Sequence, residues 1–203
     1  MNNNEKYKFL LSAVRQRLDD YRYSHVLSVF EECTRLCDLF VLSQKERDDL
    51  LTAAIFHDIT KSHKGSKQAE LANELGLILD RDDLESPATL HAITGARLIS
   101  VEFAEYANEE ICSAVLCHTV GREGMTLVEK LLYLADYIEP SRTFEDCIAV
   151  REHFYSQINS GVTPLVALDS ALLISFDLTI GQLLRDNAKI HPQTVRSRNY
   201  LIK

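Results

Sequence analysis

Apolar side chains recur at three- and four-residue steps along nearly the whole chain of 203 residues, a period typical of α-helices. Between residues 24 and 41, for example, Val26, Val29, Cys33 and Leu36 share one helix face. No segment shows a convincing strand alternation, and only seven glycines and four prolines are available for turns. We therefore predict an all-α fold, a compact helical bundle of about nine helices with short connections.

Capping residues indicate where several of these helices begin. The segments SQKE (43–46) and TLVE (126–129) match the capping box, in which a hydroxyl and a glutamate satisfy the first free N–H groups of a helix. Further helix starts are expected at Pro87, Asn108 and Thr163. No linker or repeat divides the chain, so we predict one domain over residues 1–203, with an N-terminal helix in residues 1–20 and a C-terminal tail at residues 188–203 that forms a last short helix.

The composition limits the class of partner. A formal net charge of −8 argues against binding to a nucleic-acid polymer, which needs a basic face, but does not exclude a small phosphorylated ligand. No apolar run approaches the roughly 20 residues of a membrane span, and the first residues lack a secretion signal, so we expect a cytoplasmic protein without a membrane partner. The five cysteines include no C-x-x-C pair, and we expect them to be reduced packing residues.

Six imidazoles and carboxylates fall on helix faces that should be buried. They are His25, His57, Asp58, His91, His118 and Asp136. A single histidine on such a face is usually a hydrogen-bonded core residue, but a buried carboxylate without a partner costs several kcal/mol. A shared cation explains all six residues together. Nitrogen and oxygen ligands without a thiolate favour iron, manganese or another octahedral ion over structural zinc.

The adjacent pair His57 and Asp58 predicts more than one cation. Neighbouring residues on a helix diverge by about 100°, so they converge only on an ion that lies beside both. A carboxylate can bridge two ions, whereas an imidazole cannot. We therefore predict that Asp58 bridges a two-metal centre and that His57 binds one of the two ions.

In this order, the six residues form the pattern H…HD…H…H…D, which resembles the dinuclear version of the HD-domain metal-dependent phosphohydrolases. Within that group, three segments are similar to the symmetrical bis(5′-nucleosyl)-tetraphosphatases. These segments are HDITK (57–61), HTVGREGMTLVEKLLYLADYIEPSR (118–142) and HPQTVRSRNYLI (191–202). The similarity extends from about Tyr23 to the C-terminus.

The resemblance implies an all-α HD-domain fold with two divalent or mixed-valence metal ions, iron first, with manganese or cobalt as alternatives. It also implies hydrolysis of diadenosine tetraphosphate and related dinucleoside polyphosphates to two ADP. By matching positions, one metal takes His25, His57, Asp58 and Asp136, and the other takes Asp58, His91 and His118. Ala92 and Val120 depart from the family pattern, and neither removes a ligand.

Further residues are candidates for contact with the substrate. Lys61, three residues beyond Asp58, is expected to bind a phosphate or order the attacking water, so we take Asp58 and Lys61 as the catalytic pair. His63, in the polar segment KSHKG, is expected to contact substrate. A solvated surface lysine is the alternative for Lys61.

Four more substrate-binding candidates lie near the predicted ligands. Arg122, in the GREG loop after His118, is expected to reach the phosphates with a bidentate guanidinium. Arg142 is either a phosphate ligand or an ion-pair partner of Glu139. Thr94 and Thr119 are expected to hydrogen-bond the substrate or the metal ligands.

Other functions remain open at this stage. The same residues suit another HD-domain nucleotidase or phosphodiesterase, a di-iron oxygenase, or a nucleotide sensor without catalytic activity. The expected partner in each phosphate-binding case is a dinucleoside polyphosphate or a nucleotide, and assembly as a homodimer is left open.

Overall fold

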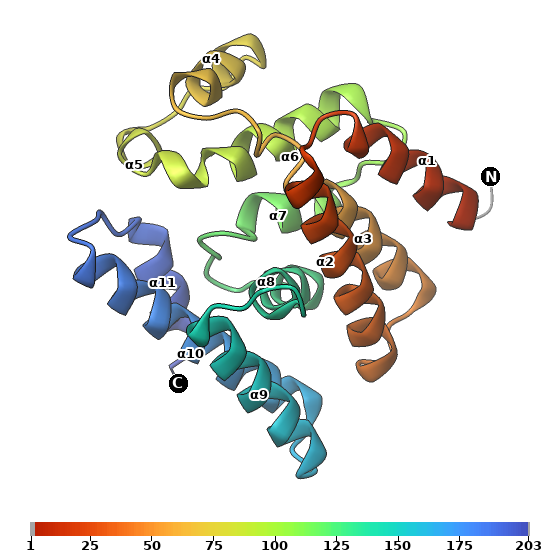
Figure 1. The fold of residues 1–203 in the computed structure, drawn as a ribbon, viewed down its shortest axis with the longest axis vertical. Coiled ribbons are helices and arrows are strands. Elements are labelled where there is room, and N and C mark those ends of the chain that lie inside the picture. Colours follow the sequence, from red (N-terminus) through yellow and green to blue (C-terminus); the bar gives the residue numbers. More distant parts are fainter. Residues whose placement is uncertain (1–2, 203) are drawn as a thin grey trace.

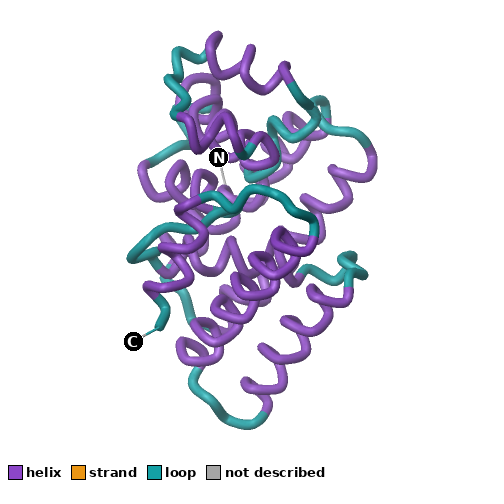
Figure 2. The backbone as a smooth tube through the Cα atoms, turned by 90° about the vertical axis from the view of Figure 1, so that its left-hand side faces the viewer, coloured by secondary structure: helices purple, strands orange, loops and turns teal. Residues whose placement is uncertain are grey.

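All regular structure in the computed structural model is helical over the described residues, 3–202 (Figures 1 and 2). In chain order the elements are α1 (Asn3–Arg15), α2 (Asp20–Leu39), α3 (Gln44–Phe56), α4 (Ser66–Glu74), α5 (Arg81–Glu85), the 3-10 helix η1 (Pro87–Thr89), α6 (Leu90–Glu102), α7 (Glu109–Cys117), α8 (Leu127–Ile138), α9 (Glu145–Asn159), α10 (Pro164–Arg185) and α11 (Pro192–Tyr200). The predicted all-α class is confirmed. The described chain has eleven α-helices rather than about nine, and the predictions for residues 1, 2 and 203 lie outside it.

Helix α8 lies at the centre of the molecule, seen almost end-on in Figure 1. It packs against α2, α3 and α7 on one side and against α9 and α10 on the other. Eight of its twelve residues are buried, because most of the sequence of α8 is apolar and neighbouring helices pack on both sides of it. Of its polar side chains, Glu129 is fully buried, whereas Lys130 and Asp136 are each slightly less than one fifth exposed.

The predicted caps are present at three helix starts. Ser43 and Thr126 each form a complete capping box, and Asn108 accepts a hydrogen bond from the Ile111 N–H. One predicted start is displaced, because residues 87–89 form a 3-10 turn and α6 begins at Leu90. The predicted short helix near the C-terminus is α11.

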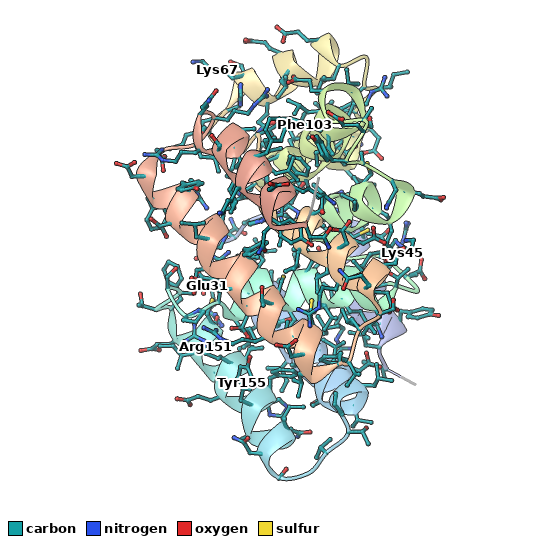
Figure 3. The ribbon with its side chains drawn as sticks, turned by 90° about the vertical axis from the view of Figure 1, so that its right-hand side faces the viewer. Glu31, Lys45, Lys67, Phe103, Arg151 and Tyr155 are labelled. Carbon is teal, nitrogen blue, oxygen red and sulfur yellow. The ribbon has the colours of Figure 1, made fainter. Side chains whose placement is uncertain are left out.

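Helix α9 fixes the turn that follows α8. The Arg151 guanidinium on α9 donates to the backbone carbonyls of Ile138 and Glu139 at 2.6 Å and of Arg142 at 2.8 Å. One turn further along α9, the Tyr155 hydroxyl donates to the Glu32 carboxylate on α2. Figure 3 shows Arg151 and Tyr155 on α9 beside the part of α2 that carries Glu31. These contacts hold the α8–α9 turn against α9, and α9 against α2.

Helix α10 is long and apolar enough to cross a membrane by length and composition, with a mean hydropathy of 1.5 over its most apolar window. The expectation that no segment approaches a membrane span is therefore wrong for α10. Two aspartates interrupt its apolar run, and each is paired with a neighbouring helix. Asp169 accepts from Lys130 on α8 at 2.5 Å, and Asp177 accepts from Arg198 on α11 at 2.7 Å. Core helices of globular proteins meet the same criteria of length and composition.

All five cysteines are unpaired, and four of them are buried. Burial raises the pKa of the Cys37 thiol to about 11 and that of the Cys117 thiol to about 12. Both groups are therefore protonated at neutral pH, whereas metal ligation and nucleophilic attack require a thiolate. This agrees with the prediction that the cysteines are packing residues.

Candidate metal centre

The structure brings all six predicted ligand side chains into one buried cluster, hereafter the His/Asp cluster. It consists of His25 on α2, His57 and Asp58 at the end of α3, His91 on α6, His118 at the end of α7 and Asp136 on α8. The cluster forms because the apolar faces of these five helices pack around one point of the core. Each imidazole is no more than 5 % exposed, and Asp58 is 2 % exposed.

His25, His57 and Asp136 form the first of two groups within the cluster. The His25 Nε2 atom lies 2.9 Å from Asp136 Oδ1 and 3.3 Å from His57 Nε2. His57 Nε2 lies 3.9 Å from the same Asp136 oxygen. The three potential donor atoms are within 4.8 Å of one another, a spacing at which one cation could contact them all.

Asp58, His91 and His118 form the second group. Asp58 Oδ1 lies 3.3 Å from His91 Nε2 and 3.9 Å from His118 Nε2, and the two imidazole nitrogens are 3.1 Å apart. The other oxygen, Asp58 Oδ2, lies 3.8 Å from His57 Nε2 and 4.0 Å from His25 Nε2 in the first group. The Asp58 carboxylate thus lies between the two groups, with one oxygen towards each, as a bridging ligand requires.

A hydrogen bond at Nδ1 decides the tautomer of three imidazoles in the cluster. The Nδ1 atom of His57 lies 2.8 Å from the Ala54 carbonyl, that of His91 lies 3.0 Å from the Ala88 carbonyl, and that of His118 lies 2.6 Å from the Val115 carbonyl. A carbonyl oxygen only accepts, so each Nδ1 carries the proton and donates it. The Nε2 lone pairs of these three histidines therefore face carboxylate oxygens and other imidazole nitrogens of the cluster. Such a set of acceptors fits a pair of cations.

Three of the four imidazoles in the cluster are favoured in their neutral form. Burial lowers the pKa of His57 and His91, and it lowers the pKa of His118 to about 4. For Asp58, burial opposes ionisation, but His57 and Lys61 hold the pKa of the carboxyl below its usual range.

His25 has the opposite shift. Burial lowers the pKa of its imidazole, but hydrogen bonds to Asp136 and Glu139 outweigh burial and raise the pKa to about 9. The His25 Nδ1 atom lies 3.0 Å from Glu139 Oε1, and Glu139 is only 1 % exposed. His25 is therefore the one imidazole of the cluster whose Nδ1 donates to a carboxylate instead of a backbone carbonyl.

Three cationic side chains surround the accessible side of the cluster. Lys61 Nζ lies 2.9 Å from His91 Nε2 and 3.9 Å from Asp58 Oδ1, and Arg22 Nη1 lies 3.4 Å from Asp58 Oδ2. Arg142 donates to Asp136 Oδ1 at 2.6 Å. All three cationic side chains remain about one third exposed, so each can contact an anion that approaches the cluster.

Lys61 and His63 line a cavity of about 350 Å³ next to His91, together with Arg22 and Lys64. The cavity contains no carboxylate among its lining residues, so its charge is positive. Contact of Lys61 and His63 with a phosphorylated ligand stays a prediction.

The other substrate-binding candidates are placed differently. Arg142 forms its ion pair with Asp136, not with Glu139, so that alternative was wrong. Arg122 pairs with the buried Glu129 carboxylate at 2.8 Å. Thr94 is fully buried and bonded to Gln68, Thr60 and its own helix, behind His91. Thr94 also donates to the backbone carbonyl of the predicted ligand His91 at 3.5 Å. Contact of Arg122 or Thr94 with substrate stays a prediction.

Thr119, next to His118, has a buried hydroxyl oxygen without a hydrogen-bond partner among the described residues. It lines a separate cavity of about 220 Å³ with Arg122 and His191. Its contact with substrate stays a prediction.

Two features of this site were not predicted from the sequence. One is the contact of Arg22 with Asp58, and the other is the hydrogen bond between Glu139 and His25. Arg22 precedes His25 by three residues, and Glu139 follows Asp136 by three residues, so each shares a helix face with a predicted ligand. That spacing is the signal by which both residues could have been found.

The model of the HD domain family matches residues 22–141, which include all six residues of the His/Asp cluster. The chain belongs to the HD-domain family. This HD-domain protein is 32 % identical to the symmetrical bis(5′-nucleosyl)-tetraphosphatase of Bacillus subtilis, over 95 % of each chain. It is 28 % identical to the Staphylococcus aureus enzyme of the same name, over 98 % of this chain and 94 % of the relative.

A similar crystal structure is that of a predicted HD superfamily hydrolase involved in NAD metabolism from Clostridium acetobutylicum. The TM-score is 0.82 at 30 % sequence identity, over 97 % of this chain and 96 % of the other. The fold of this HD-domain protein is thus shared along nearly its whole described length.

Proposed function

We propose that this protein is a metal-dependent symmetrical bis(5′-nucleosyl)-tetraphosphatase, which hydrolyses diadenosine tetraphosphate to two ADP. The observation that carries the proposal is the His/Asp cluster, in which acceptor atoms face one another and three cationic side chains surround the accessible side. Relatives that match along nearly the full chain and bear this enzyme name support the same reaction.

Two metal ions are the proposed cofactors. His25, His57, Asp58 and Asp136 would hold one ion, and Asp58, His91 and His118 would hold the other, with Asp58 between them. Such an ion pair lowers the pKa of a water molecule and neutralises charge on a phosphoryl group. We propose iron, with manganese or cobalt as alternatives, because the donors are nitrogen and oxygen and the thiols are protonated.

The protein's own contribution is positioning and charge. Lys61 lies beside both Asp58 and His91, where its ammonium can hold a phosphate oxygen close to the cluster. Arg22 and Arg142 lie next to Asp58 and Asp136 and can bind the phosphates on either flank. Phosphoryl transfer needs little covalent chemistry from the protein, so these charges would contribute by orienting the substrate and stabilising the departing ADP.

These three cationic side chains favour a polyphosphate substrate over the alternative functions of an HD-domain protein. A di-iron oxygenase needs dioxygen, and a nucleotide sensor would bind without turnover. Three positive groups around one cluster instead suit a substrate with several negative charges in a row.

Product analysis tests the proposal. Metal-loaded protein, incubated without oxygen with diadenosine tetraphosphate, is expected to release ADP alone, and a chelator should stop the reaction. Equal amounts of AMP and ATP would contradict symmetrical cleavage, and a requirement for oxygen would favour the oxygenase. Asp58→Ala should lose both metals, whereas His91→Ala should lose mainly one. Equal metal content in the two variants would contradict the ligand assignment.

Location in the cytoplasm and assembly as a homodimer stay predictions. Fractionation of cells with an antibody to this protein tests the first. Light scattering of the purified metal-loaded protein tests the second.

A further inference from the structure

We propose that a second cavity, hereafter the α8–α10 cavity, binds one nucleoside of the dinucleotide substrate. It lies between the end of α8, the α8–α9 turn and the C-terminal half of α10, which are close together in Figure 1. Its volume of about 650 Å³ is within the usual range of small-molecule sites. This inference rests on the proposed function, because it names where a part of that substrate is held.

Arg142 connects this cavity to the His/Asp cluster. Its side chain lines the cavity while its guanidinium donates to the Asp136 carboxylate and to the Asp136 carbonyl, each at 2.6 Å. The backbone of Arg142 is held in turn by Arg151 from α9. A nucleotide whose phosphates contact Arg142 can therefore extend from the cluster directly into the α8–α10 cavity.

The lining of the cavity suits an uncharged base and ribose. Phe144 is 64 % exposed, so its ring is available for stacking on a base. Gln182 offers an amide, which both donates and accepts hydrogen bonds, as the edge of a base requires. Glu145 and Asp146 are acceptors that suit ribose hydroxyls.

The α8–α10 cavity and the cavity beside His91 differ in the charge of their lining residues. The α8–α10 cavity has two arginines and two carboxylates in its lining, whereas the cavity beside His91 has Arg22, Lys61 and Lys64 and no carboxylate. Phosphates are favoured at the positive cavity and a neutral nucleoside at the balanced one. The two cavities and the cluster between them thus divide the substrate according to charge.

Phe144→Ala tests the proposal, because the side chain is exposed and its loss leaves the core intact. Calorimetric titration of the metal-loaded variant with ADP should show binding weakened roughly ten- to hundredfold, the usual contribution of base stacking on an aromatic ring. Titration with inorganic pyrophosphate should be unchanged, because pyrophosphate has no base. Phe144→Tyr should restore ADP binding.

Phe9→Ala is the matched control, since Phe9 is likewise an exposed phenylalanine, with 49 % of its surface accessible, but lies on α1, outside the cavity. It should leave both titrations unchanged. Unchanged ADP affinity in Phe144→Ala, absence of ADP binding to the unaltered protein, or an equal loss for pyrophosphate would each overturn the proposal. If ADP binding depends on Phe144 while diadenosine tetraphosphate is not cleaved, the cavity stands and the proposed function fails.

Discussion

At the scale of single residues, Glu139 makes one imidazole of the cluster different from the rest. Its carboxylate accepts from His25 and also from the Ser141 N–H at 2.6 Å and hydroxyl at 2.7 Å. A carboxylate partner fixes the ring of a ligating histidine and increases its basicity. We therefore expect the ion held by His25 to be bound more tightly than the ion held by His91 and His118.

Glu139→Gln keeps the shape of the side chain but removes its charge. The affinity of the His25 site for metal should fall roughly 10- to 100-fold, while the other site changes little. Metal content after competition with a graded series of chelators measures both effects. Asp49→Asn is the control, because Asp49 is a buried carboxylate that contacts Lys45 and Asn108 away from the cluster. Equal metal retention by the two variants would refute the role of Glu139.

The buried imidazoles predict a pH dependence of the metal-free protein. The pKa of His118 is lowered by burial to about 4, so the unfolded chain, with an ordinary value of 6.5, binds this proton first as the pH falls. Stability from this group is present above pH 6.5 and is lost as the pH falls towards 4, up to about 3 kcal/mol. His25, whose pKa is raised to about 9, has the opposite effect. Its contribution to stability is present below pH 6.5 and is lost as the pH rises towards 9.

Urea unfolding of the metal-free protein at pH 7 and pH 5 measures this dependence. The free energy of unfolding should be lower at pH 5, and the difference should shrink in His118→Gln. A free energy that stays constant over this interval would show that His118 does not remain neutral in the folded state.

The predictability of the cluster depended on residue type. Carboxylates and imidazoles on apolar helix faces were recognisable from sequence, because burial of such groups demands a partner. The ion-pair partners of these groups were harder to predict from the sequence. Arg122 follows His118 closely in sequence, yet its guanidinium pairs with Glu129, which is fully buried and needs that charge. Which of two nearby groups an arginine contacts depends on tertiary packing.

At the scale of elements, helix starts were predicted better than short or irregular helices. Ser43, Asn108 and Thr126 cap through local hydrogen bonds, so the sequence alone contains the information. Helix α5 was missed because none of its five residues is buried, and it therefore has no apolar period. The turn at Pro87–Thr89 forms a 3-10 helix, which shares the composition of an α-helix start.

At the scale of the whole molecule, the C-terminal segment is part of the support of the cluster. The Ser197 hydroxyl on α11 donates to the Val120 carbonyl at 3.0 Å, two residues beyond His118. Gly121, the next residue, has a φ of +67° and lies against both α10 and α11. The loop that follows a predicted metal ligand is thus held by helices from the other end of the chain.

Gly121→Ala tests this contact. The added Cβ would lie 2.7 Å from Phe176 Cζ on α10 and 2.9 Å from Ser197 Oγ on α11, and positive φ adds backbone strain. The free energy of unfolding should fall by about 2–4 kcal/mol, measured by urea denaturation. Gly161→Ala is the control, because Gly161 has a φ of +87° but no atom of residues 3–202 lies within 4 Å of the added Cβ, so only strain of about 1 kcal/mol is expected. An equal loss in the two variants would mean that close packing of the loop against α10 and α11 contributes nothing.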